Sequence, residues 1–143
     1  MKQSGFEKLE RSKNVLYGPR KLILCGFSAP AQAKFKTLLD MIGCTDLPLV
    51  WTNSENYRLT LSELLELENG YRQGHGSDMV RAIIASGITQ IELHRLMNGS
   101  RQAGMQKALW AVLTPVSEKW TLSKLLHELK AEQKKMAERS RSK

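Results

Sequence analysis

The chain has few of the residues and patterns by which several classes of protein are recognised. Its 143 residues include two cysteines, Cys25 and Cys44, whose spacing matches neither a metal site nor a redox pair, so both are expected to stay reduced. No apolar run approaches the ~18 residues that span a bilayer, and the first residues lack the apolar stretch of a signal peptide. We therefore expect a cytoplasmic protein with no membrane partner.

Signatures of cofactor binding and catalysis are also missing. Gly26 and Gly87 each follow a predicted strand, but neither belongs to a GxGxxG or a GxxxxGK[ST] run. The three histidines, His75, His94 and His127, do not have the spacing of zinc ligands. The leading prediction is thus a non-enzymatic protein with no cofactor and no metal.

The formal net charge of +8 is concentrated at the two ends of the chain. Residues 1–20 contain five basic and two acidic side chains, and residues 130–143 contain six and two. Between them, residues 21–70 sum to −2 and residues 71–129 to +3. The second half of the central region is therefore the more suitable one to meet an anion.

The central region carries the same pattern twice at an offset of 61 residues, without a gap. Residues 20–68, the first half, align with residues 81–129, the second half, and two glycines and a Thr-Leu-Ser-x-Leu-Leu run are shared. This self-similarity predicts a tandem duplication. The identical pairs are Arg20/Arg81, Ile23/Ile84, Gly26/Gly87, Gly43/Gly104, Thr60/Thr121, Leu61/Leu122, Ser62/Ser123, Leu64/Leu125 and Leu65/Leu126.

The first half reads as strand, helix, strand, helix. Apolar runs at 21–25 and 47–51 predict strands, and helical spacing of apolar residues predicts a helix over about 29–42. A second helix is expected to open at Thr60, where Glu63 completes a capping box.

The second half repeats this plan. Strands are predicted at 82–86 and 108–113, with a helix between them that opens at the capping box of Thr89 and Glu92. Thr121 is expected to cap the last helix.

These elements predict a single α/β domain over residues 20–129, with a four-stranded, mainly parallel sheet and helices on both faces. Residues 69–80 form the link between the halves, 1–19 a basic N-terminal extension, and 130–143 a basic, partly helical tail. If all four strands are parallel, every loop from a strand to the next helix lies at one edge of the sheet, where ligands of such sheets bind.

The candidate binding site is placed at that edge, in the second half. Two cations and two hydroxyls gather at the start of the last helix, where free amides and the helix dipole attract an anion. The same residues also fit a simple helix cap with solvated lysines. The predicted ligand-binding residues are Lys119, Thr121, Ser123, Lys124, Gly87 and Thr89.

The predicted partner is a protein or a small anion. One alternative is an accessory nucleic-acid binder, in which the basic ends give weak, salt-sensitive binding. Another is a small hydrolase or transferase that uses Cys25 or its equivalent, Ser86, as a nucleophile, although no histidine is placed by the sequence to activate either.

Residues 81–129 resemble an uncharacterised bacterial family of short domains, a domain of unknown function. The resemblance implies a small, soluble bacterial protein and assigns no catalytic residue. It is carried by Arg81-Ala-Ile, Ser86-Gly87, Glu92-Leu93, Gly104, Thr114-Pro115 and Trp120-Thr121-Leu122-x-x-Leu125-Leu126.

Overall fold

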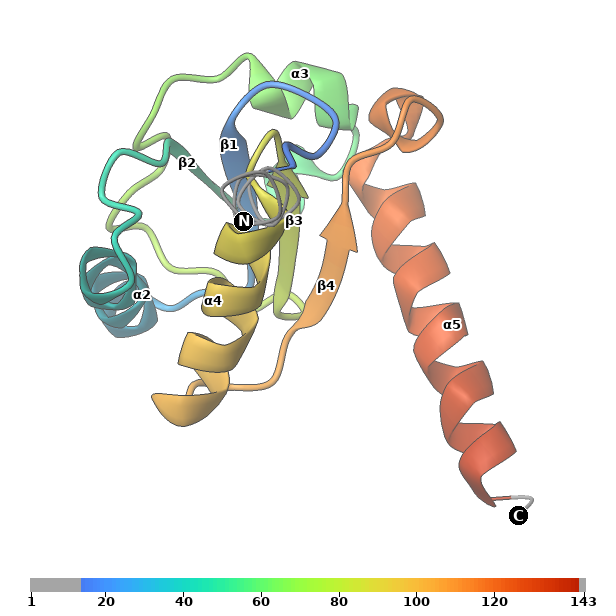
Figure 1. Cartoon of the computed structure of the whole chain (residues 1–143). Helices are drawn as coiled ribbons and strands as arrows, with labels where there is room; N and C mark the ends of the chain where they lie inside the picture. Colours follow the sequence, from blue (N-terminus) through green and yellow to red (C-terminus); the bar gives the residue numbers. More distant parts are fainter. Residues whose placement is uncertain (1–13, 142–143) are drawn as a thin grey trace, which may run out of the picture.

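The computed structural model describes residues 14–141 and contains a four-stranded sheet of order β2-β1-β3-β4 (Figure 1). Strand β1 pairs with β2 in parallel, and β3 pairs with β4 in parallel. The strands are β1 (Lys21–Cys25), β2 (Leu49–Thr52), β3 (Ala82–Ser86) and β4 (Leu109–Val112). The predicted α/β fold with a mainly parallel four-stranded sheet is confirmed.

The two central strands, β1 and β3, are antiparallel, and this corrects one expectation. The strand-to-helix loops do not share one edge, because the carboxyl ends of β1 and β2 lie opposite those of β3 and β4. The physical reason is that β1 and β3 are almost wholly buried apolar runs, and such a run satisfies the core in either direction.

Helices cover both faces of the sheet, as predicted. Helices α2 (Ala29–Met41) and α4 (Gln90–Gln102) pack on one face, and α3 (Leu61–Leu65) and α5 (Leu122–Arg141) on the other (Figure 1). Two short 3-10 turns, η1 (Ser54–Asn56) and η2 (Ser117–Lys119), precede α3 and α5.

Side chains at the helix starts explain where these helices begin. Thr60 accepts a hydrogen bond from the backbone amide of Glu63, and the Glu63 carboxylate accepts one from the amide of Thr60. Thr89 and Glu92 make the same reciprocal pair at α4. Both predicted capping boxes are therefore confirmed.

The two halves are arranged about an approximate twofold axis. The bounds of β1 and α2 become those of β3 and α4 when 61 is added. Residues 61 apart also face each other across the seam between the halves: Ile23 opposite Ile84 in the β1–β3 ladder, and Thr60 opposite Thr121 in an isolated bridge. This geometry agrees with the offset found in the sequence, while descent from a duplicated ancestor stays a prediction.

Residues 14–19, assigned from the sequence to an extension, lie against the second half. The amide of Leu16 donates to the carbonyl of Ile88, and the amide of Gly87 donates to the carbonyl of Tyr17. At the other end, the predicted partly helical tail is the continuation of α5 as far as Arg141. Residues 1–13 and 142–143 of the predicted extensions lie outside the described residues.

Within residues 14–141, no helix combines the length and the apolar character needed to cross a membrane.

Candidate functional site

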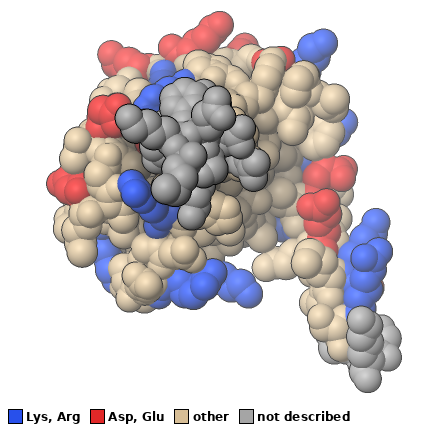
Figure 2. All heavy atoms as spheres, viewed as in Figure 1, with Lys and Arg blue, Asp and Glu red and all other residues tan. Residues whose placement is uncertain are grey.

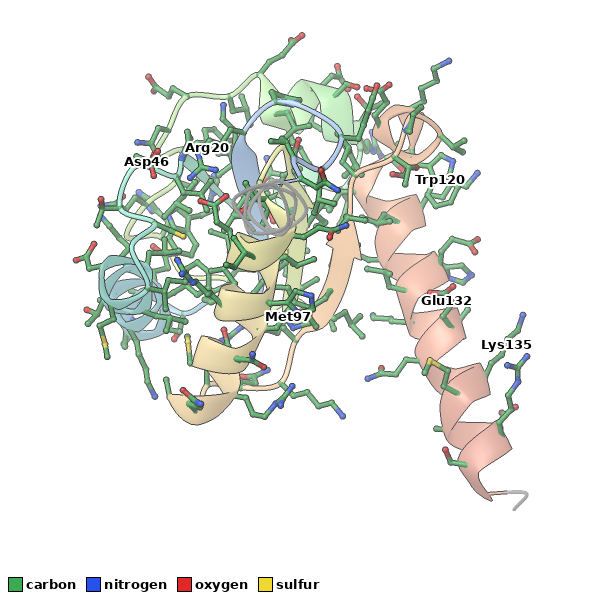
Figure 3. All side chains as sticks on the ribbon, in the orientation of Figure 1. Arg20, Asp46, Met97, Trp120, Glu132 and Lys135 are labelled. Carbon is green, nitrogen blue, oxygen red and sulfur yellow. The ribbon has the colours of Figure 1, made fainter. Side chains whose placement is uncertain are left out.

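Arg20 is neutralised by carboxylates at the start of β1. Its guanidinium donates two hydrogen bonds of 2.7 Å to the carboxylate of Glu92 and a longer one of 3.2 Å to Asp46. Figure 3 shows Arg20 and Asp46 side by side. The hydrogen bonds from Arg20 lower the pKa of Glu92 to about 2, because they favour its charged form. The charge of Arg20 is therefore balanced by an ion pair with Glu92.

Arg81, the equivalent residue of the second half, has no such partner. Its side chain is buried, with 6% of its surface exposed, and its Nε donates to the carbonyl of Gly26 at 2.9 Å. The guanidinium carbon stacks 3.9 Å from the centre of the Phe27 ring. Within residues 14–141 neither of its Nη nitrogens makes a hydrogen bond or an ion pair.

The positions that correspond to the carboxylates around Arg20 hold no acidic residue around Arg81. With the offset of 61 residues, Ala31 is the equivalent of Glu92, and Lys107 is the equivalent of Asp46. Arg101 likewise stands at the position of Asp40. Arg20 thus has acidic side chains around it, whereas the equivalent positions around Arg81 hold an alanine and two cations.

The same comparison explains a cavity of about 410 Å³ beside Arg81, between α4, the loop to β4 and the sheet. In the first half the equivalent space is filled by Leu39 and Leu47, both buried. In the second half these positions hold Ser100 and Ala108, which are smaller and leave the space open. The cavity is lined by Phe27, Phe35, Arg81, Ile83, Met97, Ser100, Arg101, Met105, Gln106, Lys107, Ala108 and Trp110.

The cavity has an apolar interior and cations at its wall. Figure 3 shows Met97 reaching from α4 into the region between α4 and β4. Arg81 is buried, whereas Arg101 and Lys107 are exposed residues of the lining. An apolar volume of this size with a few placed polar groups is typical of a small-molecule site.

Two groups in the wall gain from an anionic or oxygen-bearing ligand. Burial lowers the pKa of the Arg81 guanidinium, since it penalises the charged form, and a bound anion would offset that penalty. The hydroxyl Oγ of Ser100 is buried without a hydrogen-bond partner in residues 14–141. Such an unsatisfied group costs about 1–3 kcal/mol.

The residues predicted from the sequence at the start of α5 lie together, but the backbone amides there are occupied. The amide of Leu122 donates to the carbonyl of Leu59, that of Ser123 to Tyr57, and that of Lys124 to the Thr121 hydroxyl. The free amides on which an anion site at this helix start depends are therefore absent from the described structure.

The two predicted lysines at this helix start are exposed. Lys119 ends the turn η2, and the ammonium of Lys124 lies 4.8 Å from the centre of the Trp120 ring. Ser123 is also exposed, and Thr121 is half-buried as the cap of α5. This arrangement agrees with the simpler interpretation of a capped helix with solvated cations.

Gly87 and Thr89 lie at the same sheet edge, beneath the segment that leads into β1. A Cβ atom on Gly87 would clash with the backbone of Gly18, Pro19 and Arg20, and Thr89 pairs with Val15 in an isolated bridge. This segment covers both residues, so the predicted anion site is not formed as one open surface.

Cys25 and Ser86 are both fully buried. Thr52 donates a hydrogen bond to the sulfur of Cys25, and burial raises the pKa of that thiol to about 12. Ser86 donates to the carbonyl of Pro19. In residues 14–141 neither nucleophile is hydrogen-bonded to a histidine or a carboxylate, and we do not retain the catalytic alternative.

Another hollow, of about 430 Å³, lies where β1 and β2 end. It is polar, and its only charged lining residue in the described part of the chain is Asp78, so it lacks the cation that distinguishes the Arg81 cavity. The described residues also contain no group of three or more His, Cys, Asp or Glu side chains placed to hold a metal ion.

The charge of the second half predicted where the cationic residues of the cavity lie, but the individual cavity residues were not predicted. In the sequence, Arg81 stands out as a residue shared by the two halves and by the family resemblance, but not as a site residue. The signal was present in the alignment, because Asp40 and Asp46 align with Arg101 and Lys107.

The fold and cavity define a small α/β protein with a partly open cavity that has cations in its wall. Residues 81–136 match the family described as Domain of unknown function (DUF3783), which confirms the resemblance to an uncharacterised domain family. The match covers the second half and most of α5, and so includes Arg81 and the loop from α4 to β4. Neither the curated proteins nor the solved structures contain a match to the chain.

Proposed function

We propose that this protein is a non-enzymatic binding module for a small organic anion, which it holds in the Arg81 cavity. The ligand is a monocarboxylate with an apolar body. The observation that carries the proposal is a buried guanidinium without a carboxylate partner at the wall of a 410 Å³ cavity. A buried cation is costly unless it is paired, and the position that would pair it in this chain is Ala31.

The wall suggests how such a ligand binds. The two Nη groups of Arg81 form a planar fork that matches the two oxygens of a carboxylate. Ser100 also lines the cavity, and rotation of its hydroxyl-bearing side chain toward the ligand would add a third hydrogen bond. The apolar body then lies against Phe35, Met97 and Trp110, where its burial contributes about 25 cal/mol per Å².

The two surface cations, Arg101 and Lys107, support the same ligand in another way. Both line the cavity and are exposed, so their interaction with a bound anion is screened by water and salt. Their larger effect is on the approach of an anion rather than on its affinity. Affinity for a carboxylate is therefore expected to depend mainly on Arg81.

The proposal is tested with 8-anilinonaphthalene-1-sulfonate as a fluorescent anionic probe, displaced by straight-chain carboxylates from butanoate to decanoate. Alcohols of the same lengths are the neutral controls. We expect carboxylates to displace the probe at concentrations at least about tenfold lower than the alcohols, because a charge-assisted bidentate pair contributes more than a neutral hydrogen bond.

Variants assign the binding to the cavity. Arg81→Met is expected to remove the preference for carboxylates, whereas Arg58→Met, which removes one exposed arginine of the first half, is expected to keep it. Equal affinity of Arg81→Met and the unchanged protein for decanoate would contradict the proposal. So would equal displacement by decanoate and decanol.

Weak binding of nucleic acid through the basic ends of the chain stays a separate prediction. Such binding falls steeply with salt, whereas occupancy of a buried pocket changes little, so a salt titration distinguishes the two.

A further inference from the structure

The outer edge of β4 is unpaired in the described part of the chain. The amides of Leu109 and Leu113 donate to carbonyls of Arg81 and Ala85, beside and in β3. Since hydrogen-bonding groups alternate along a strand, the amides of Trp110 and Val112 point away from β3. No described residue accepts from either of them.

The first half covers the equivalent edge with its own chain. After α3 the chain returns along β2, where the amide of Leu49 donates to Asn69 Oδ1 and the amide of Gly70 donates to the carbonyl of Leu49. The amide of Trp51 donates to the carbonyl of Tyr71, and Tyr71 pairs in parallel with Val50. Residues 69–71 thus act as a fifth strand segment beside β2.

In residues 14–141 the second half makes no such return, because its last helix continues through the equivalent positions. Helix α3 ends at Leu65, whereas α5 runs for 20 residues to Arg141 and leaves the body of the protein (Figure 1). The positions equivalent to 69–71 are Lys130, Ala131 and Glu132, all within α5.

A groove of about 640 Å³ remains between the start of β4 and the protruding part of α5. Figure 2 shows this part of α5 standing apart from the rest of the surface. The groove is lined on the strand side by residues 107–110 and on the helix side by Leu129, Lys130, Glu132, Gln133, Lys134, Met136, Ala137 and Ser140.

The groove has both apolar and charged features. Leu129 packs partly against the core, and Met136, two turns further along α5, is 67% exposed. Three lysines, Lys107, Lys130 and Lys134, line the groove together with a single carboxylate, Glu132. The charge of the groove therefore favours an acidic occupant over a second copy of this basic chain.

We propose that an extended acidic segment of a partner protein binds in this groove as a strand beside β4, parallel to it as residues 69–71 are parallel to β2. The open amides of Trp110 and Val112 recognise its backbone, the lysines its carboxylates, and Met136 its apolar side chains. A row of backbone donors and acceptors at strand spacing fits a polypeptide rather than a nucleic acid.

The probe is a fluorescein-labelled peptide, Glu-Val-Glu-Val-Glu-Thr-Glu-Val, whose binding is followed by anisotropy. Two further versions carry N-methyl groups on alternate residues, one on odd and one on even positions. Only one set of alternate amides faces β4 in a strand complex, so one methylated version is expected to lose binding by at least about tenfold while the other keeps it. Equal effects of the two methylation patterns would overturn strand addition.

Two protein variants locate the interaction. Val112→Pro removes one outward amide, and proline is tolerated on an edge strand when that amide faces solvent, so the sheet is expected to stay folded. We expect this variant to weaken peptide binding at least about tenfold. A double variant, Lys130→Glu with Lys134→Glu, alters only exposed side chains of α5 and is expected to weaken it as strongly.

Several results would overturn the proposal. These are unchanged affinity in Val112→Pro or in the double variant, no binding of the acidic peptide at millimolar concentration, or tighter binding of a matched Lys-Val peptide. Sedimentation showing a dimer that Val112→Pro dissociates would also overturn it, because a second copy would then occupy the edge. Binding of the peptide by Arg81→Met is expected to be unchanged, which separates this groove from the anion cavity.

Discussion

Arg20 and Arg81 occupy the same position in the two halves of the fold and have opposite surroundings. Arg20 holds a bidentate pair with Glu92, in a half whose equivalent cavity is filled by leucines. Arg81 is buried beside an open cavity and has no carboxylate partner in the described residues. The difference teaches that the same scaffold position forms an ion pair in one half and, among the described residues, keeps a buried cation without a carboxylate in the other.

The strongest test of this comparison replaces each arginine by methionine. Arg20→Met is expected to lower the free energy of unfolding by about 2–3 kcal/mol, because it leaves the mostly buried Glu92 carboxylate without its cation. Arg81→Met is expected to lower it by only about 1 kcal/mol, because the lost hydrogen bond to Gly26 and the lost Phe27 stack are partly offset by removal of a buried charge, and no ion pair is broken. Urea unfolding of the two variants measures this, and equal losses would contradict the comparison.

The Arg20–Glu92 pair also predicts how stability depends on pH. The pKa of Glu92 is lowered to about 2 in the folded state, so its contribution is present above its ordinary pKa of about 4.3 and is lost as pH falls through 2. We expect the unchanged protein to lose about 2 kcal/mol more than Glu92→Gln between pH 5 and 2. Urea unfolding at a series of pH values tests this, and parallel profiles would disprove it.

A third test makes the second half resemble the first. The double variant Ser100→Leu with Ala108→Leu places leucines where Leu39 and Leu47 stand. We expect it to fill the cavity, to raise the free energy of unfolding by about 1 kcal/mol, and to abolish displacement of the fluorescent probe by decanoate. Retained decanoate binding would place the ligand elsewhere.

The smallest expected effect concerns the two sheet edges. Asn69→Ala is expected to lower the free energy of unfolding by about 0.5–1.5 kcal/mol, because the amide of Leu49 loses its acceptor. Lys130→Ala changes the equivalent residue of the second half, which is exposed on α5, and is expected to have no measurable effect. Thermal unfolding of the pair gives the comparison, which fails if Lys130→Ala is the more damaging change.

Much of the fold was predictable, because local signals decide where these elements begin. Thr60 and Thr89 head complete capping boxes, and both start the helices that the sequence predicts. The directions of β1 and β3 were not predictable in this way. Their pairing is set by packing between distant segments, and their nearly continuous apolar sequences read alike in either direction.

The candidate site was less predictable than the fold. The positive charge of the second half pointed to an anion, but the predicted helix start at Thr121 has its amides taken by the chain near Leu59. The Arg81 cavity depends on volume missing at Ser100 and Ala108. A cavity of this kind forms between segments that are far apart in the sequence, so no local motif predicts it.

The walls of the cavity come from both halves, since Phe27 and Phe35 belong to the first and Trp110 to the second. A compound that fills the cavity therefore contacts both halves. Its binding raises the free energy needed to separate them by RT ln(1 + [L]/Kd). Saturating compound would thus slow hydrogen exchange along the whole β1–β3 seam, although Ile83 alone of that ladder lines the cavity.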